Sequence, residues 1–170
     1  MTSTQSYARH DLGYSLLSKA YDELHGEEQL RKLSIIKAEL GIESSDSLLD
    51  VGCGTGLSAS LGCSVTGVDN CMEMVGKAGH RIKSVLANAE SLPFPSKSFD
   101  RVICVTAIHN FSDAKSALAE MSRVSRKDVV VSVLKKSKKS ALIDSLIRSM
   151  LCVNKLIDDP SDSIYFCVAR

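Results

Sequence analysis

The chain has 170 residues, a net charge of +1 at pH 7 and 44% hydrophobic residues. A domain of this size buries enough apolar surface to fold without disulfides or a structural metal. The near-neutral charge argues against a partner, such as nucleic acid, that binds through overall basic charge, although it does not exclude one.

The cysteines and the N-terminus indicate an intracellular protein. None of the six cysteines forms a C-x-x-C pair, so we expect free thiols in a reducing compartment and no metal site. The first ten residues have no apolar segment like that of a signal peptide, and no apolar run reaches the ~18 residues needed to span a membrane. These features predict a cytoplasmic protein without a membrane segment or a bound metal.

Residues 1–41 are predicted to be helical. An earlier helical segment is expected to break near Gly26, and a second one to end before Gly41, a suitable stop residue. The apolar residues of the second segment recur at helical spacing. They are Leu30, Leu33, Ile36 and Leu40.

From residue 47 onward, short apolar strands alternate with helices. Strands are predicted over 48–51, 64–69, 82–86, 99–106 and 128–134, and helices over 70–77, 113–124 and 140–150. Ser112 is the expected N-cap of the second of these helices. Residues 151–157 and 164–169 flank a turn and predict a hairpin. We therefore expect an α/β fold: a doubly wound, mostly parallel seven-stranded sheet with an antiparallel C-terminal hairpin, in one domain (1–170) whose α/β core is 47–170.

A glycine-rich segment after the first strand is the strongest functional signal. Glycine adopts positive φ and lets a ligand approach the backbone, and the exposed N–H groups of such a turn are expected to bind an anion. The spacing G-x-G-x-G differs from the G-x-G-x-x-G of dinucleotide folds, and an acid two residues earlier repels a pyrophosphate but suits an ammonium group. The pattern favours S-adenosylmethionine (SAM) over NAD, with an ordinary turn as the alternative. The segment comprises Asp50, Gly52, Cys53, Gly54, Thr55 and Gly56.

Polar residues also end the next two strands. Asp69 is placed to accept hydrogen bonds from both hydroxyls of a ribose, which SAM and NAD share, although an acid at this junction is often only a helix cap. Asn88 follows the third strand and is placed to bond an adenine amino group. Together the two residues predict a nucleoside site.

These segments together closely resemble the class I SAM-dependent methyltransferases of the ubiquinone/menaquinone C-methyltransferase-like type, over about residues 47–132. The resemblance implies that the segment from Asp50 to Gly56 holds the methionine part of SAM. It also implies a ribose contact, an adenine contact and a site near the methyl donor. The residues at these positions are Asp69 with Asn70, Asn88 with Ala89, and Ala107 with Ile108, respectively.

Three departures from the family pattern stand out. The adenine-contacting position is commonly Asp and is Asn88 here. The stretch between Gly56 and Val65 is short, so the first helix after the glycine segment is expected to have only a turn or two. The usual Pro-Gly-Gly turn before the fifth strand is replaced by residues 125–128, which we expect to form a turn away from the cofactor.

The resemblance implies an in-line displacement of a methyl group, for which the protein mainly aligns acceptor and donor. His109, just past the fourth strand, is the candidate general base, and the alternative is a histidine that shapes the pocket rim. Four lysines between Lys135 and Lys139 end the fifth strand at the expected cofactor rim. They suggest contact with a polyanion such as RNA, and a solvated loop is the alternative.

Three functions remain open at this point. The first is a SAM-dependent methyltransferase that acts on a small molecule or RNA. The second is a non-catalytic SAM-fold subunit or a partner-dependent tRNA/RNA methyltransferase component, completed by a small activating partner protein. The third is a nicotinamide-dependent oxidoreductase, which the glycine spacing and the lack of a second domain disfavour. The first is the function we expect.

Overall fold

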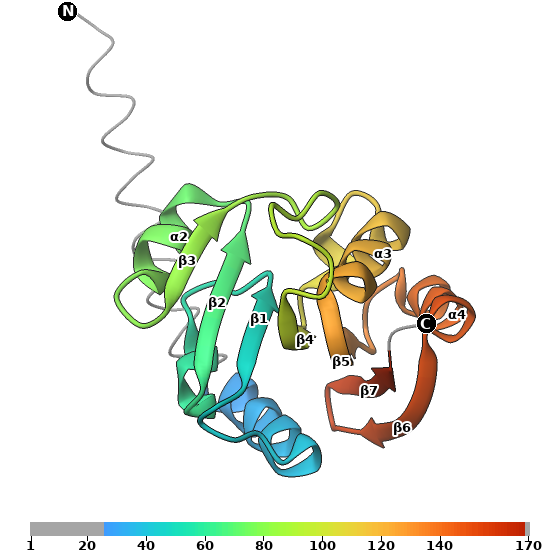
Figure 1. Cartoon of the computed structure of the whole chain (residues 1–170). Helices are drawn as coiled ribbons and strands as arrows, with labels where there is room; N and C mark the ends of the chain where they lie inside the picture. The colour runs from blue at the N-terminus through green and yellow to red at the C-terminus, as the bar shows by residue number, and fades with distance from the viewer. Residues whose placement is uncertain (1–25, 169–170) are drawn as a thin grey trace, which may run out of the picture.

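Seven strands form one sheet in the computed structural model, which describes residues 26–168 (Figure 1). The strands lie in the order β3-β2-β1-β4-β5-β7-β6, and the first five run parallel. β7 is antiparallel to β5 and to β6, so the predicted fold class is confirmed. The strands are β1 (Ser47–Val51), β2 (Ser64–Asp69), β3 (Lys83–Leu86), β4 (Phe99–Val105), β5 (Ser125–Leu134), β6 (Cys152–Asp158) and β7 (Asp162–Val168).

Helices follow most of the parallel strands, whereas a segment without a helix joins β3 to β4. A helix over residues 26–40 precedes β1, and its predicted stop before Gly41 is confirmed. The helical segment expected before Gly26 lies outside the described residues. A short 3₁₀ helix follows the glycine segment, as its length predicted. The remaining helices are η1 (Leu57–Leu61), α2 (Met72–Ala78), η2 (Ile108–Asn110), α3 (Ala114–Val124) and α4 (Ser140–Met150).

Alternate strand residues face two separate apolar cores. Leu48 and Val130 pack in a cluster with Ile36 of the N-terminal helix. Leu49 and Val129 pack in the other cluster, with Leu118 of α3. Successive side chains of a strand point to opposite faces of the sheet, so both faces are covered. This double coverage explains the uninterrupted apolar runs of the central strands, such as Leu48 with Leu49 in β1 and residues 129–131 in β5.

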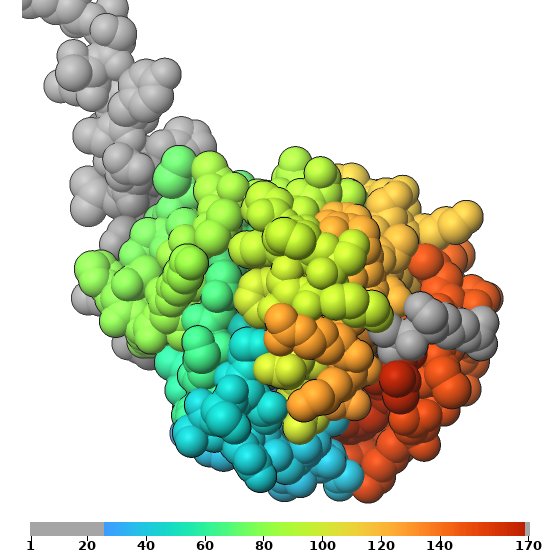
Figure 2. Space-filling view, viewed as in Figure 1, coloured from blue at the N-terminus to red at the C-terminus, as the bar shows by residue number. Residues whose placement is uncertain are grey.

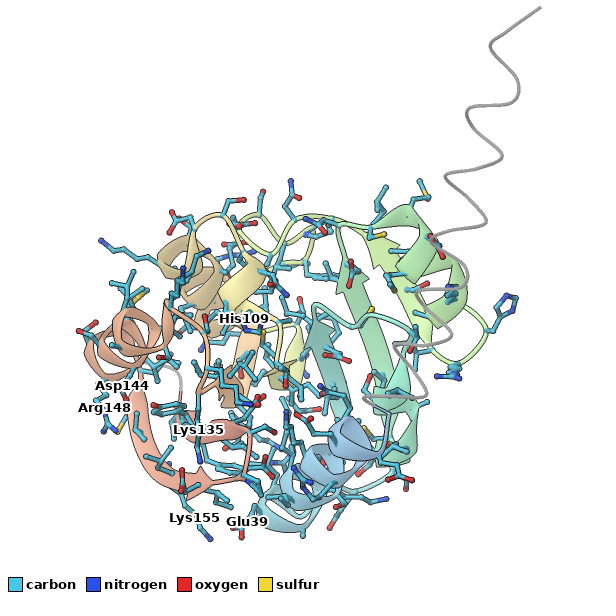
Figure 3. The ribbon with its side chains drawn as sticks, turned by 180° about the vertical axis from the view of Figure 1, so that it is seen from behind. Glu39, His109, Lys135, Asp144, Arg148 and Lys155 are labelled. Carbon is cyan, nitrogen blue, oxygen red and sulfur yellow. The ribbon has the colours of Figure 1, made fainter. Side chains whose placement is uncertain are left out.

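Ion pairs join the N-terminal helix to the C-terminal hairpin. The Arg31 guanidinium donates to both carboxylate oxygens of Asp159, at 3.0 and 2.9 Å. Lys155 of β6 donates to Glu39 at 2.6 Å, and this pair lies at the edge of the molecule in Figure 3. The helix and the hairpin lie side by side along the lower edge of the space-filling view (Figure 2). Segments from opposite ends of the described chain thus form one side of the domain.

Two local expectations were wrong. Asp113, not Ser112, caps α3, because its side chain accepts hydrogen bonds from the backbone N–H groups of Lys115 and Ser116. Residues 125–128 form no turn but begin β5, which follows α3 directly. In the part of the chain that the structure describes, no helix has the length and apolar character needed to cross a membrane.

Candidate functional site

A cavity of about 280 Å³ opens where the glycine segment follows β1, beside the carboxyl ends of β2 and β4. β1 pairs with β2 on one side and with β4 on the other, so the strand order reverses here. Ligands of doubly wound sheets bind at such a switch point. The topology therefore marks this cavity as the candidate site.

Most of the predicted site residues line this cavity. They come from the glycine segment, the end of β2, the segment after β3 and the segment after β4. They are Asp50, Gly52, Cys53, Gly54, Thr55, Asp69, Asn70, Ala89 and Ala107.

Four predicted residues do not line the cavity. Ile108 is fully buried in the core beneath it. Asn88 is exposed, while its neighbours Ala87 and Ala89 line the wall, because alternate residues of an extended segment point in opposite directions. A Cβ on Gly56 would meet Ala78 of α2 at 3.1 Å, which turns this residue toward the helix. The fourth residue is His109.

The glycine segment does not form the expected anion-binding concavity. The N–H groups of Gly52 and Cys53 both donate to the Val68 carbonyl, at 2.8 and 3.0 Å. Gly54 N–H donates to Asp69 Oδ2 at 3.0 Å, and Gly56 N–H donates to the Cys53 carbonyl. These donors are therefore satisfied within the protein, and the segment instead presents a small-residue surface to the cavity.

The charge of the cavity comes from carboxylates. Asp50, Asp69 and Glu90 line it, and no lysine, arginine or histidine of residues 26–168 does. Burial raises the pKa of Asp50 to about 6, the Ser58 hydroxyl opposes this rise and the charge of Asp69 adds to it. Oδ1 of Asp69 accepts from the Cys71 N–H at 3.0 Å, which fixes the orientation of that carboxylate together with Gly54. The cavity thus favours a cationic ligand.

His109 lies in η2, outside the cavity wall. Its Nδ1 is buried and has no hydrogen-bond partner among the described residues. Burial lowers its pKa, and the nearby Lys139 and Lys32 lower it further, while Asp162 acts in the opposite direction. Figure 3 shows His109 near the centre of the domain, above Lys135. His109 therefore lies behind the cavity wall and does not face the cavity.

Comparison with known proteins agrees with this geometry. Residues 49–133 match the family described as a methyltransferase domain. The chain belongs to this methyltransferase family. The matched range begins in β1 and ends in β5, so it includes the glycine segment and most of the cavity.

Two relatives match this methyltransferase domain over about half of their own length. The uncharacterized protein MJ1252 of Methanocaldococcus jannaschii is 38% identical over 119 residues, which cover 68% of this chain and 47% of that protein. The demethylmenaquinone methyltransferase of Tropheryma whipplei is 35% identical over 130 residues, which cover 71% of this chain and 50% of that protein. The methyltransferase domain therefore spans about half the length of these relatives.

Solved structures with the same fold match nearly the whole chain. A SAM-dependent methyltransferase from Aquifex aeolicus aligns with a TM-score of 0.74 at 15% identity, covering 90% of this chain and 98% of that one. A complex of the Trm112 methyltransferase activator and a methyltransferase from Haloferax volcanii aligns with a TM-score of 0.73 at 18% identity, covering 89% of this chain and 93% of that one. The fold of this methyltransferase domain is that of class I SAM-dependent methyltransferases.

Several cavity residues escaped the sequence analysis. Gln29 and Leu33 of the N-terminal helix line the cavity, as do Thr106 and Phe111. Glu90 also lines it, and its Oε1 accepts the backbone N–H groups of residues 112 and 113, at 2.9 and 3.2 Å. No local motif marks the two residues of the N-terminal helix, because they reach the methyltransferase site only through tertiary packing. Thr106 and Phe111 lie in the same segment as the predicted Ala107, so position along the chain is the signal that could have found them.

Proposed function

We propose that the chain binds SAM in this cavity and transfers its methyl group to an acceptor. The observation that carries the proposal is the charge of the wall, where three carboxylates and no cationic side chain of the described residues surround the space. SAM carries a sulfonium and an ammonium group, which such a wall attracts. The methyltransferase family and fold support the same ligand.

A nicotinamide dinucleotide fits this wall poorly. Its pyrophosphate would face Asp50 and Asp69, and like charges at short range repel. Dinucleotide folds bind the pyrophosphate with backbone N–H groups of the glycine turn, but here four of these groups donate to acceptors inside the protein. The wall therefore argues against the oxidoreductase alternative.

The proposed roles of the residues follow from the fit of SAM to the wall. Asp50 would attract the ammonium group, and Asp69, already oriented by two backbone N–H groups, would accept from the ribose. Gly54 has open space on its side-chain position, which allows close approach of a ligand to the backbone. When bound, SAM supplies the activated methyl group. The protein then mainly holds the acceptor in line and excludes water.

The proposal includes no histidine base. His109 lies outside the cavity, so its proposed role is to support the rim through η2. An acceptor atom that is nucleophilic without prior loss of a proton fits a site of this kind.

The acceptor is proposed to be a small molecule or RNA. Lys139 Nζ donates to the carbonyl of Phe111, a cavity residue, at 3.2 Å, which joins the lysine run to the cavity wall. Lys136 and Lys138 are exposed, as is Lys135, which pairs with Asp158. These exposed cations support RNA as the acceptor to test first. A cytoplasmic location and a small activating partner protein belong to the same proposal.

Two measurements test the proposal. Calorimetric titration of the purified chain with SAM should show binding, and titration with NAD should not. Labelled methyl transfer from SAM, with the chain alone and with added cell extract, should label RNA or a small molecule. Absence of SAM binding would overturn the proposal, whereas binding without transfer under either condition would favour the non-catalytic subunit.

A further inference from the structure

Lys32 is a fully buried cation behind the cavity wall. Its Nζ donates to Glu28 Oε1 at 2.6 Å, to Thr106 Oγ1 at 2.9 Å and to Asp162 Oδ1 at 2.8 Å. The side chains of Lys32 and Asp162 are both 0% exposed. Since a buried ion pair adds little net stability, its presence beside a functional cavity calls for another role.

Thr106 forms hydrogen bonds with both members of this ion pair. Its hydroxyl donates to Asp162 Oδ2 at 2.8 Å, and its backbone N–H donates to Ser132 Oγ at 2.8 Å. Ser132 in turn donates to the same oxygen of Asp162. Thr106 has φ +54°, a left-handed conformation that β-branched residues rarely adopt. Such a conformation persists only when the surroundings hold it in place.

The bend at Thr106 shapes one wall of the cavity. β4 ends at residue 105, and the chain then turns so that Ala107 and Phe111 lie against Gly52. A Cβ on Gly52 would lie 2.5 Å from Ala107 Cβ and 3.4 Å from the Phe111 ring. The direction in which the chain leaves β4 therefore determines how closely these two segments approach each other.

We propose that the ion pair of Lys32 and Asp162 is a positioning device for the cavity. It holds Thr106 in its left-handed conformation and thereby sets Ala107 and Phe111 against Gly52. The same lysine anchors the N-terminal helix, two of whose residues line the cavity. Lys32, Asp162 and Thr106 are thus positioning residues, and the inference relies on the proposed function only for the identity of the ligand.

The chain offers a matched control for this idea. Arg31 also joins the N-terminal helix to the hairpin, through its two hydrogen bonds to Asp159. It reaches the Lys32 group only indirectly, because the Ser161 hydroxyl bonds both Asp159 and Glu28. Lys32→Met and Arg31→Met therefore each remove one ion pair between the same two segments. Thr106→Val removes only the hydroxyl, and Thr106→Ser keeps it.

The test combines SAM titration, chemical unfolding and amide NMR on the full chain. Lys32→Met and Thr106→Val should weaken SAM binding by at least about tenfold, as expected for displacement of a ligand-contacting wall. Thr106→Ser and Arg31→Met should bind as the wild type does, even where Arg31→Met lowers stability. In the ligand-free protein, the amide signals of Gly52 and Ala107 should shift in Lys32→Met and Thr106→Val but not in Arg31→Met.

The inference is overturned if Arg31→Met weakens binding as much as Lys32→Met, or if Thr106→Val binds like the wild type. If Lys32→Met fails to fold, the Val and Ser variants of Thr106 decide the question. If the wild type itself binds no SAM, the proposed function fails. The ligand-free NMR comparison then decides the positioning role independently, and unmoved signals of Gly52 and Ala107 would refute it.

Discussion

Gly52 and Ala107 approach so closely that a Cβ on residue 52 would lie 2.5 Å from the Cβ of Ala107. Gly52 also has φ +78°, so two independent requirements exclude a side chain there. The contact joins the glycine segment after β1 to the segment after β4, the two elements between which the strand order reverses. A side chain added at Gly52 is therefore expected to disturb the proposed site.

Gly52→Ala should reduce both stability and SAM affinity. The added Cβ would force Ala107 away, which opens the wall of the cavity. Gly41→Ala is the matched control, because Gly41 has φ +57° and nothing within 4 Å of its side-chain position. The control should cost about 1 kcal/mol from backbone conformation and leave SAM binding unchanged. Equal stability and equal affinity of the two variants would contradict the close contact.

Asp50→Asn should stabilise the ligand-free protein above pH 6. Because burial raises the pKa of Asp50 from 3.8 to about 6, the folded chain retains a proton that the unfolded chain loses in this interval. Stability therefore falls as the pH rises from about 4 to about 6, by up to about 3 kcal/mol, and the Asn variant should not show this loss. Urea unfolding across this pH range measures the effect.

Asp50→Asn should weaken SAM binding, although it stabilises the ligand-free protein. The affinity of the wild type should rise as Asp50 ionises near pH 6, and Asp50→Asn should bind weakly with no such rise. Asp100→Asn serves as the control, since the Ser47 hydroxyl lowers the pKa of Asp100 to about 2. That carboxylate stabilises the fold above its ordinary pKa and loses this effect as the pH falls. Its removal should therefore destabilise the protein without changing its affinity for SAM. An Asp50→Asn variant that binds normally would refute the role of Asp50.

The exposed lysines of the run should matter for an RNA acceptor. The double variant of Lys136 and Lys138 to Ala should weaken RNA binding and reduce its dependence on salt, because fewer counterions are released. Gel-shift titrations at several salt concentrations measure both effects. The control replaces Lys83 and Lys97, exposed lysines at or just before the amino ends of β3 and β4, with Ala. If both double variants lose the same affinity, the run has no specific role.

Asp113→Ala should lower the midpoint of thermal unfolding by about 3 °C, because α3 loses its N-terminal cap. Ser112→Ala should have no such effect, since Ser112 contributes its backbone N–H to Glu90 and its side chain does not cap the helix. Circular dichroism melts of the two variants check this assignment. A larger effect at residue 112 would contradict the observed cap.

Residue patterns close together in the chain predicted much of this molecule. Alternation of apolar strands and helices predicted the sheet, and glycines spaced by two residues after β1 predicted the position of the cavity. These features depend on local backbone conformation and on a period of hydrophobicity, both of which are written in short segments. The predicted N-cap at Ser112 was wrong because two adjacent polar residues compete for that position and the backbone path selects Asp113.

Long-range contacts account for what the patterns missed. Lys32, Thr106 and Asp162 are separated by 74 and 56 residues along the chain, yet they form one buried hydrogen-bonded group. Whether a lysine is solvated or buried against an acid depends on which surfaces pack together, and no local pattern encodes that. The order of residues therefore specifies the α/β fold, the glycine turn and two of the cavity's carboxylates, whereas the shape of the cavity and the buried group behind it arise only when distant segments exclude water between them.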